Sequence, residues 1–293
     1  RASRSNIEVP VSDFIPYKYH WDRSTICTKK NELLQIIKID GFSFETADDD
    51  DIDMKKMVRN SLLKSMAEGT CSVWFHTLRM RNSAYPGGKQ PPGFASFLDK
   101  QWHDKHHRKD SYINELYITV VRKVEAINSG KLANLFNKNP DARQQQEAKG
   151  LRAAHKELME AVSRIISTMK DYGARLLTTY ENDLGTFSEP MEFLSKLVNC
   201  GVNNPIRCNA TDLSAYLPVR RLYFGGNVIE VSGGSGKRFA SIVAIREYGP
   251  ATAAGVLDGF LQLPFEFIIS QSFRYNDRAA QIGAMQRRQN RMI

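Results

Sequence analysis

The stretch of sequence that decides the fold lies at residues 25–39 and reads TICTKKNELLQIIKI. The segment from Thr25 to Thr28 has the β-branched and apolar composition of a short strand. The segment from Leu33 to Ile39 predicts a second strand that returns alongside the first. Lys29-Lys30-Asn31 lies between them and predicts a turn. The stretch therefore predicts a β-hairpin near the start of the chain.

The residues that follow extend this hairpin into a larger unit. Asp48 to Asp51 and Asp53 precede an apolar pattern of helical spacing, which ends before Gly69. Residues Val73 to Leu78 then predict another strand. The apolar residues of the predicted helix are Met54, Met57, Val58, Leu62 and Met66. The unit is predicted to run strand, strand, helix, strand.

Residues 227–273 predict the same order of elements. Val228 to Val231 and Phe239 to Ile245 predict strands on either side of a glycine-rich turn. Pro250 to Phe260 predicts a short helix, and Phe265 to Ser270 predicts a closing strand. The two units share little sequence identity, so either an old duplication or a common α+β solution explains the shared order.

A long helix is predicted between the two units. Two sets of residues recur seven apart, which predicts a narrow apolar stripe. The sets are Leu151, Leu158, Ile165 and Tyr172, and His155, Val162, Met169 and Leu176. Such a stripe can pack on the protein's own sheet or a neighbouring helix, or it can form an intermolecular coil. The residues from Asn137 to Gln146 are polar, contain Pro140, and predict a mobile loop before this helix.

These patterns predict an α+β fold of two strand-strand-helix-strand units with a long helical insertion between them. Because residues Gly185 to Pro190 interrupt the helical pattern, the predicted division separates residues 1–185, an α+β unit with the long helix, from residues 186–293, a second α+β unit that ends in a basic helix. We expect the sheets to be covered by helices on one face.

Composition narrows the class of protein. The chain has 293 residues, a hydrophobic content of 42% and a charged content of 25%, which is ordinary for a soluble protein with a core. Its longest apolar stretch, near Leu116 to Val121, is far shorter than the roughly 20 residues of a membrane-spanning helix. The four cysteines form no C-x-x-C pair, and Cys27 and Cys71 are predicted to be buried free thiols of a reducing compartment.

The net charge of +9 is compatible with nucleic acid, an anionic membrane surface or an acidic partner. The basic pairs are scattered along the chain, and no stripe of aromatic residues accompanies them. These pairs are Lys29-Lys30, Lys55-Lys56, Arg220-Arg221 and Arg287-Arg288. The scatter favours a solvated surface over one that follows a phosphate backbone.

Residues Val231 to Arg238 read VSGGSGKR and superficially resemble a phosphate-binding P-loop. The P-loop pattern needs Gly five positions before its Gly-Lys pair and Ser or Thr after the Lys. This chain has Val231 and Arg238 at those positions, and a strand is predicted to follow where a helix would present its amides to phosphate. A glycine-rich hairpin turn is the better interpretation.

Other chemical patterns have structural explanations. His103, His106 and His107 lie beside Asp104 and one turn from Asp99, but the cations of the same segment oppose metal binding and favour a solvated helix face. The acidic run at residues 48–53 lacks the spacing of a calcium loop and is explained by helix capping and the helix dipole. No G-x-S-x-G turn or catalytic cysteine context is found. We therefore predict no catalytic residue, cofactor or metal site in this segment.

The end of the chain predicts a basic helix from Asp277 to Ile293 without a stop signal. Its cationic residues are Arg278, Arg287, Arg288 and Arg291. Together with the first residue, Arg rather than Met, this suggests a piece of a longer protein. The four arginines are the candidate residues of a coupling helix that continues towards a missing domain.

Several longer strings resemble the amino-terminal region of the large ATPases of type IV secretion systems, the CagE/TrbE/VirB family. The resemblance extends from about Asp13 to Ile293, and its strings are family signatures, not catalytic motifs. They are Phe14–Tyr17, Asp40–Asp48, Val58–Lys64, Val198–Gly201, Tyr216–Val219, Arg221–Gly225 and Gln286–Ile293.

The resemblance implies a two-part protein that energises type IV secretion. In this family ATP and magnesium bind to a P-loop domain on the C-terminal side of the region seen here. The amino-terminal part is then a non-catalytic docking and assembly module at the cytoplasmic face of the bacterial inner membrane. The implied partners are other secretion subunits and further copies in a hexamer, with peripheral contact to the membrane.

Two alternatives accompany this interpretation. A DNA-binding module of a conjugation-type apparatus predicts an affinity whose logarithm falls linearly with the logarithm of salt concentration, and no measurable binding at about 50 mM salt would exclude it. An enzyme that acts through Lys237 or the His103 cluster predicts nucleotide turnover or a retained metal in the purified chain.

Overall fold

The computed structural model describes residues 9–41, 48–66, 71–82, 88, 91–108, 111–124, 140–208, 212–234, 236–245 and 258–274. Its strands are β1 (Tyr17–His20), β2 (Thr25–Thr28), β3 (Glu32–Ile39), β4 (Cys71–Asn82), β5 (Ser111–Lys123), β6 (Arg175–Leu176), β7 (Thr179–Asn182), β8 (Gly185–Ser188), β9 (Arg221–Phe224), β10 (Ile229–Ser232), β11 (Lys237–Ala240) and β12 (Phe267–Arg274). Its α-helices are α1 (Asp49–Met66), α2 (Phe94–Arg108), α4 (Pro140–Thr168), α5 (Glu189–Val198) and α6 (Leu213–Tyr216). Its 3-10 helices are η2 (Val11–Phe14), η3 (Lys170–Tyr172) and η4 (Asp258–Gln262). The predicted α+β class is confirmed.

The predicted hairpin is formed by β2 and β3, which pair antiparallel with Ile26 opposite Leu34. The turn is tight because Asn31 takes a left-handed backbone with φ 58°, which Asn tolerates better than most residues. The hydroxyl of Thr28 accepts hydrogen bonds from the backbone N–H groups of Lys30 and Glu32. These bonds satisfy backbone donors that the turn leaves without a strand partner.

One sheet organises the molecule, with strand order β1-β2-β3-β5-β4-β12 and β6 attached to β3. Its recorded strand pairs are all antiparallel. Strand β12 pairs with β4 over its whole length, from Phe267 opposite Arg79 to Arg274 opposite Ser72. The chain therefore returns to the first sheet after passing through every other element that the structure describes.

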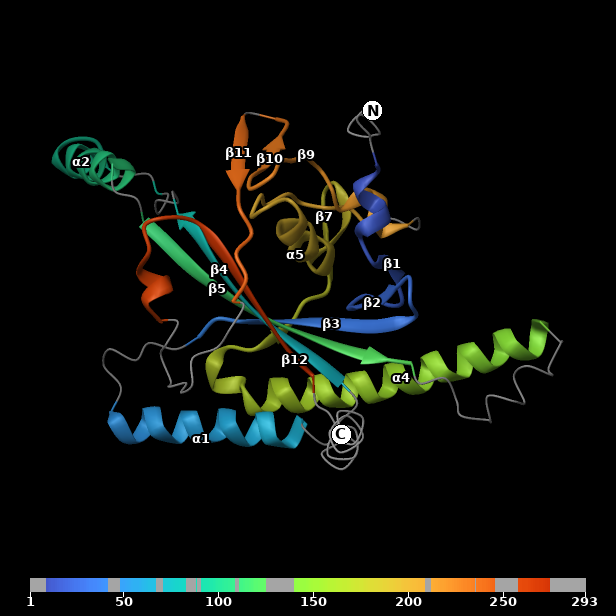
Figure 1. Cartoon of the computed structure of the whole chain (residues 1–293). Coiled ribbons are helices and arrows are strands. Elements are labelled where there is room, and N and C mark those ends of the chain that lie inside the picture. The colour runs from blue at the N-terminus through green and yellow to red at the C-terminus, as the bar shows by residue number, and fades with distance from the viewer. Residues whose placement is uncertain are drawn as a thin grey trace, which may run out of the picture.

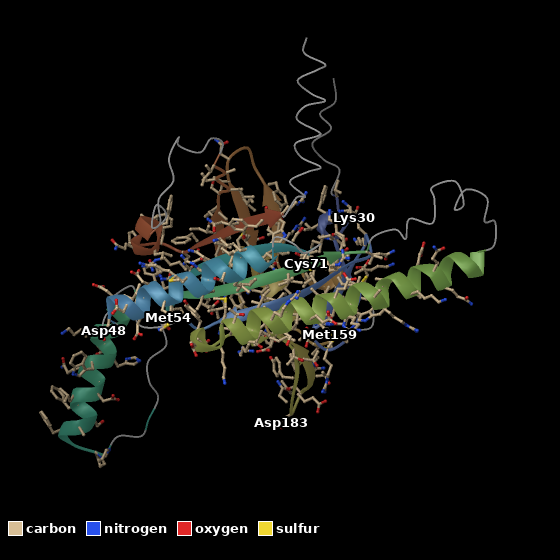
Figure 2. The ribbon with its side chains drawn as sticks, turned by 90° about the horizontal axis from the view of Figure 1, so that it is seen from below. Lys30, Asp48, Met54, Cys71, Met159 and Asp183 are labelled. Carbon is tan, nitrogen blue, oxygen red and sulfur yellow. The ribbon has the colours of Figure 1, made fainter. Side chains whose placement is uncertain are left out.

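One face of this sheet is covered by α4, and α1 lies beside α4 (Figure 1). The predicted stripe of α4 is buried on β3 and β5 through Leu158, Val162 and Ile165. Packing on the protein's own sheet, one of the two predicted outcomes for this stripe, is thus what the structure shows. Figure 2 shows α1 and α4 side by side under the sheet, with the side chain of Met159 on the exposed side of α4.

The limits of this helix differ from the prediction. Residues 140–146, predicted as part of a mobile loop, belong to α4, and Asn137 lies outside the described residues. Pro140 is the first residue of the helix. A backbone N–H at this position would have no acceptor within the helix, and the fixed φ of proline suits a helical start. The stripe also stops early, because α4 ends at Thr168 and Gly173 takes a left-handed φ of 65°. Leu176 belongs to β6 instead.

The opposite face of the sheet is covered by α5, α6 and the residues before β1. Met191, Leu194 and Leu213 are fully buried there. The side chain of Ser188 caps α5 by accepting the Met191 N–H, and Pro190 follows in the first turn. The expectation that helices cover one face is therefore wrong for this sheet, because both of its faces are apolar and both are packed.

The second predicted unit does not form its own four-element sheet. Strands β9, β10 and β11 form a separate three-stranded sheet, whereas β12 joins β4. The predicted strand from Phe239 to Ile245 is shorter and lies at Lys237–Ala240, and residues 250–257 of the predicted helix lie outside the described residues. The division between residues 185 and 186 stays a prediction, although β12 places residues from beyond it in the main sheet.

Candidate docking site on the β9–β10–β11 sheet

The glycine-rich segment is a hairpin turn between β10 and β11, as predicted. Gly233 and Gly234 have φ values of 126° and 64°, which side chains with a Cβ rarely adopt. The strand β11 follows this turn where a P-loop would have a helix. The ammonium of Lys237 lies 2.8 Å from the carboxylate of Glu230 on the neighbouring strand. Lys237, which would contact the phosphate in a P-loop, is therefore engaged in an ion pair with Glu230.

The register of the small sheet separates its residues into two faces. Glu230 lies opposite Tyr223 on one side and Phe239 on the other, and Ser232 lies opposite Arg221 and Lys237. Residues opposite each other in antiparallel strands share a face. We call the set of Tyr223, Phe239, Glu230, Arg221 and Lys237 the docking face.

The docking face points to solvent. The exposed fraction of Phe239 is 69% and that of Tyr223 is 45%. The guanidinium of Arg221 lies 5.0 Å from the centre of the Tyr223 ring. Glu230 lies between the two aromatic residues in register, and its ion-pair partner Lys237 lies on β11, two residues before Phe239. Hydrogen bonding to Glu230 raises the pKa of Lys237. The ammonium of Lys237 is therefore charged at neutral pH.

The other face attaches the small sheet to the body around Val231, whereas Phe224, opposite Ile229 on the same face, is exposed. Val231 is buried, and Ile229 and Leu222 are half-buried. The backbone N–H of Arg220, just before β9, donates to the buried side chain of Asn199 at the end of α5. Arg238 on β11 forms an ion pair with Glu266, which lies just before β12, at 3.1 Å. These contacts connect the small sheet to α5 and to the segment before β12.

Apolar exposure continues after β11. Ile242 and Val243 are almost fully exposed, and Ile245 is also exposed. Monomeric proteins seldom expose contiguous apolar patches of large size, and aromatic residues together with Arg are enriched where proteins bind one another. The arrangement has the chemistry of a protein-binding surface.

The strand β12 is fastened to the sheet by side chains as well as by its backbone. Arg79 donates from Nε to the Leu263 carbonyl at 2.8 Å, and the Tyr112 hydroxyl donates to the Pro264 carbonyl at 2.8 Å. His76 lies 2.8 Å from the Ser270 hydroxyl. The segment that leads to residue 274 is therefore held by β4 and β5.

A partly buried polar cluster, which the sequence did not indicate, joins α4 to the β1–β2 turn. The carboxylate of Asp22 lies 2.6 Å from Nε2 of His155 and accepts hydrogen bonds from Thr25, whose hydroxyl also accepts from Gln35. Hydrogen bonds from Ser24 and Thr25 and the nearby His155 lower the pKa of Asp22 despite its partial burial, which alone would raise it. Asp, His and Thr side chains also occur together in catalytic sites. Here they bond to one another and to neighbouring residues of the fold, so we interpret the cluster as a structural contact between α4 and the turn.

The other predicted candidates are placed apart from the docking face. His103 and Asp104 lie on α2, with the imidazole Nδ1 3.5 Å from the carboxylate. Among the residues that the structure describes, no group of three or more His, Cys, Asp or Glu side chains could hold a metal ion. The acidic run supplies the first turn of α1, as predicted. The candidate coupling residues Arg278, Arg287, Arg288 and Arg291 lie outside the described residues.

The four cysteines are free thiols, as was predicted for Cys27 and Cys71. Cys27 is buried, and Cys71, Cys200 and Cys208 are half-buried. Burial raises the pKa of each thiol. They are therefore protonated and poorly nucleophilic at neutral pH.

Comparison with known proteins gives this α+β module its class, a component of type IV secretion systems. Residues 24–129 match the family model described as type IV secretion system ATPase VirB4/TrbE, N-terminal domain. Residues 175–293 match the model of the CagE, TrbE, VirB family, component of type IV transporter system.

Individual relatives agree with both models. The chain is 32% identical to the type IV secretion system protein virB4 of Bartonella henselae over 96% of its length, and 27% identical to virB4 of Brucella melitensis over 94%. It is 24% identical to the type IV secretion system protein PtlC of Bordetella pertussis over 98%. The chain belongs to the VirB4/TrbE family and corresponds to the N-terminal region of a type IV secretion ATPase. It spans about a third of these relatives, which is 36%, 33% and 35% of their respective lengths.

Proposed function

We propose that this chain is the non-catalytic docking and assembly module of a type IV secretion ATPase. In this role it links an ATP-driven motor to channel subunits at the cytoplasmic face of the bacterial inner membrane, for export of protein or DNA. ATP and magnesium bind in a C-terminal domain, and the full-length protein assembles as a hexamer. Membership of the VirB4/TrbE family supports other secretion subunits as the partners.

The observation that carries the docking role is the exposed docking face. Tyr223 and Phe239 present two aromatic side chains on a rigid sheet, and such anchors lose little conformational entropy on binding. Arg221 supplies a cationic group beside them, whereas Lys237 is paired with Glu230 of the same face. This combination favours a partner with an apolar centre and an acidic group beside it.

The position of β12 supports the linking role. Strand β12 pairs with β4 at eight positions, from Phe267 to Arg274. A displacement of the chain that follows Arg274 would therefore be transmitted to β4. The bonds from Arg79 and Tyr112 hold the start of the same segment. A pull on β12 is therefore resisted by the main sheet and not by a single loop.

The test is co-purification of the chain with individual subunits of its own secretion system, expressed together in pairs. We expect one subunit to be retained by the wild-type chain and lost with the variant Tyr223→Ser/Phe239→Ser. The matched control is Met159→Ser/Leu184→Ser, which removes exposed apolar side chains from α4 and from the β7–β8 turn. Equal retention by both variants would contradict docking through this face, and retention of no subunit by the wild type would contradict the docking role.

A further inference from the structure

Helix α2 carries an exposed apolar stripe. Phe94, Phe97, Leu98 and Trp102 occupy positions that an α-helix brings to one side, over an arc of about 140°. The exposed fractions of Phe94, Phe97 and Trp102 are 78%, 60% and 49%, and Leu98 is exposed as well. Within a protein core such a stripe would be covered, so its exposure needs an explanation.

The position of α2 leaves this stripe open. Strands β4 and β5 pair from Cys71 opposite Arg122 to Asn82 opposite Ser111, and α2 lies in the connection at the far end. Figure 1 shows α2 apart from the two packed faces of the main sheet, and the view from below in Figure 2 shows the same separation. In the part of the chain that the structure describes, no other helix or strand packs along α2.

Positive charge is concentrated around α2. We call the segment from Arg79 to its strand partner Asn114 the α2 excursion; it includes the ends of β4 and β5 as well as the connection between them, and it contains 36 residues. Seven of these residues are Lys or Arg and three are Asp, which leaves a net charge of +4 out of the +9 of the whole chain. The cations are Arg79, Arg81, Lys89, Lys100, Lys105, Arg108 and Lys109. About an eighth of the residues thus carries almost half of the net charge.

The composition of α2 suits the boundary between lipid headgroups and acyl chains. Trp and Phe on one face with Lys nearby are typical of helices that lie in the plane of a membrane surface. The ammonium of Lys105 lies 5.1 Å from the centre of the Trp102 ring. Helical spacing places Lys105 within the arc of the stripe, where its ammonium can extend to the headgroups while its methylene groups stay on apolar surface. In the described parts of the chain no helix is long and apolar enough to cross a membrane.

We propose that α2 is an interfacial anchor that lies on an anionic bilayer, with Phe94, Phe97, Leu98 and Trp102 inserted below the headgroups. The positive net charge of the α2 excursion favours anionic lipid. The wide arc of the apolar stripe fits the planar boundary between headgroups and acyl chains. This inference rests on the proposed location at the membrane, and it gives that location a physical contact. The docking face then remains free for a protein partner.

The experiment is sedimentation of the purified 293-residue chain with vesicles of phosphatidylcholine alone or with about 30% phosphatidylglycerol. We expect binding about tenfold or more tighter to the anionic vesicles, weakening between about 0.1 M and about 0.5 M salt. The variant Phe97→Ser/Trp102→Ser is expected to bind at least about tenfold more weakly, because it removes the apolar contact. The control Met159→Ser/Leu184→Ser is expected to bind as the wild type does.

A charge variant separates the two contributions. Lys89→Glu/Lys100→Glu changes no residue within the arc of the apolar stripe, and we expect it to lose most of the preference for anionic vesicles while it keeps weak binding to neutral ones. Circular dichroism of each variant reports whether it folds. The wild-type comparison of vesicle types tests the anchor without any substitution.

Three outcomes would overturn the anchor. They are wild-type binding to neither vesicle type, equal loss of binding in the α2 variant and the control, and a wild-type dimer that the α2 variant dissociates without any vesicle binding. The last outcome would assign the stripe to a second copy of the chain. Failure of the anchor would leave the docking proposal standing, because co-purification with secretion subunits measures the docking proposal separately.

Discussion

At the scale of single residues, His76 shows how burial sets a pH response. Its ring is 6% exposed, lies against Phe193 and contacts the Ser270 hydroxyl of β12. Burial lowers the pKa of His76 from 6.5 to about 4. Between pH 6.5 and about pH 4, His76 is therefore protonated in the unfolded chain and neutral in the folded chain. The free energy of unfolding falls as the pH falls through this range.

We predict that the wild-type chain loses about 2 kcal/mol more stability than His76→Phe between pH 7 and pH 5. The Phe variant keeps an aromatic ring and removes the titrating group. Urea unfolding at the two pH values measures the difference. Burial also lowers the pKa of His20, so the variant retains part of the pH dependence. An identical loss in both proteins would contradict the assignment to His76.

The buried pair of Lys196 and Glu115 gives a second residue-scale prediction. Lys196 on α5 lies 2.5 Å from the carboxylate of Glu115 on β5, and both side chains are largely buried. Lys196→Met leaves a carboxylate without its partner and is expected to cost about 3 kcal/mol of unfolding free energy. The double variant Lys196→Met/Glu115→Gln removes both charges and is expected to recover most of that loss. Equal losses in the two variants, measured by urea unfolding, would show that packing rather than charge holds α5 here.

At the scale of elements, local pattern predicted β2, β3, α1 and the buried stripe of α4. These elements are specified by residues that are neighbours in sequence, so periodicity finds them. The pairing of β12 with β4 could not be found this way, because His76 and Ser270 are 194 residues apart. The same holds for the cluster of Asp22 and His155. The docking face could not be predicted from local sequence pattern either, because cross-strand register decides which side chains of β9, β10 and β11 share a face.

Two neighbouring residues of α4 test the importance of its stripe. Leu158 is fully buried on the sheet, whereas Met159 is exposed on the other side of the helix. We expect Leu158→Ala to lower the free energy of unfolding by about 2–5 kcal/mol and Met159→Ala to change it by less than about 0.5 kcal/mol. Thermal or urea unfolding measures both variants. Equal effects would mean that α4 does not pack as the structure shows.

At the scale of the whole molecule, three features lie on different parts of the structure. The docking face lies on the small sheet, the apolar stripe of α2 lies at the end of the β4–β5 connection, and β12 forms an edge of the main sheet. Since β4 is shared by the α2 excursion and by β12, a force on β12 acts on the strand that carries the proposed membrane anchor. The main sheet thus joins β12 to the strand next to α2, whereas the docking face, on its separate sheet, is linked to the segment before β12 by the Arg238–Glu266 ion pair.

The final prediction concerns the segment after β12, where the sequence predicts a helix from Asp277 to Ile293. We propose that this helix transmits movement of the ATP-driven domain to the module in the full-length protein. Gln286→Gly/Gln289→Gly weakens helix formation by about 2 kcal/mol relative to the same positions with Ala, without changing the length or the charge of the segment. We expect the Gly variant to keep ATP turnover and to lose most of its secretion. The control Gln286→Ala/Gln289→Ala is expected to keep both, because it retains the helix. Secretion and ATP turnover that both persist in the Gly variant would show that this segment does not couple the two parts, whatever the role of the sheet to which β12 belongs.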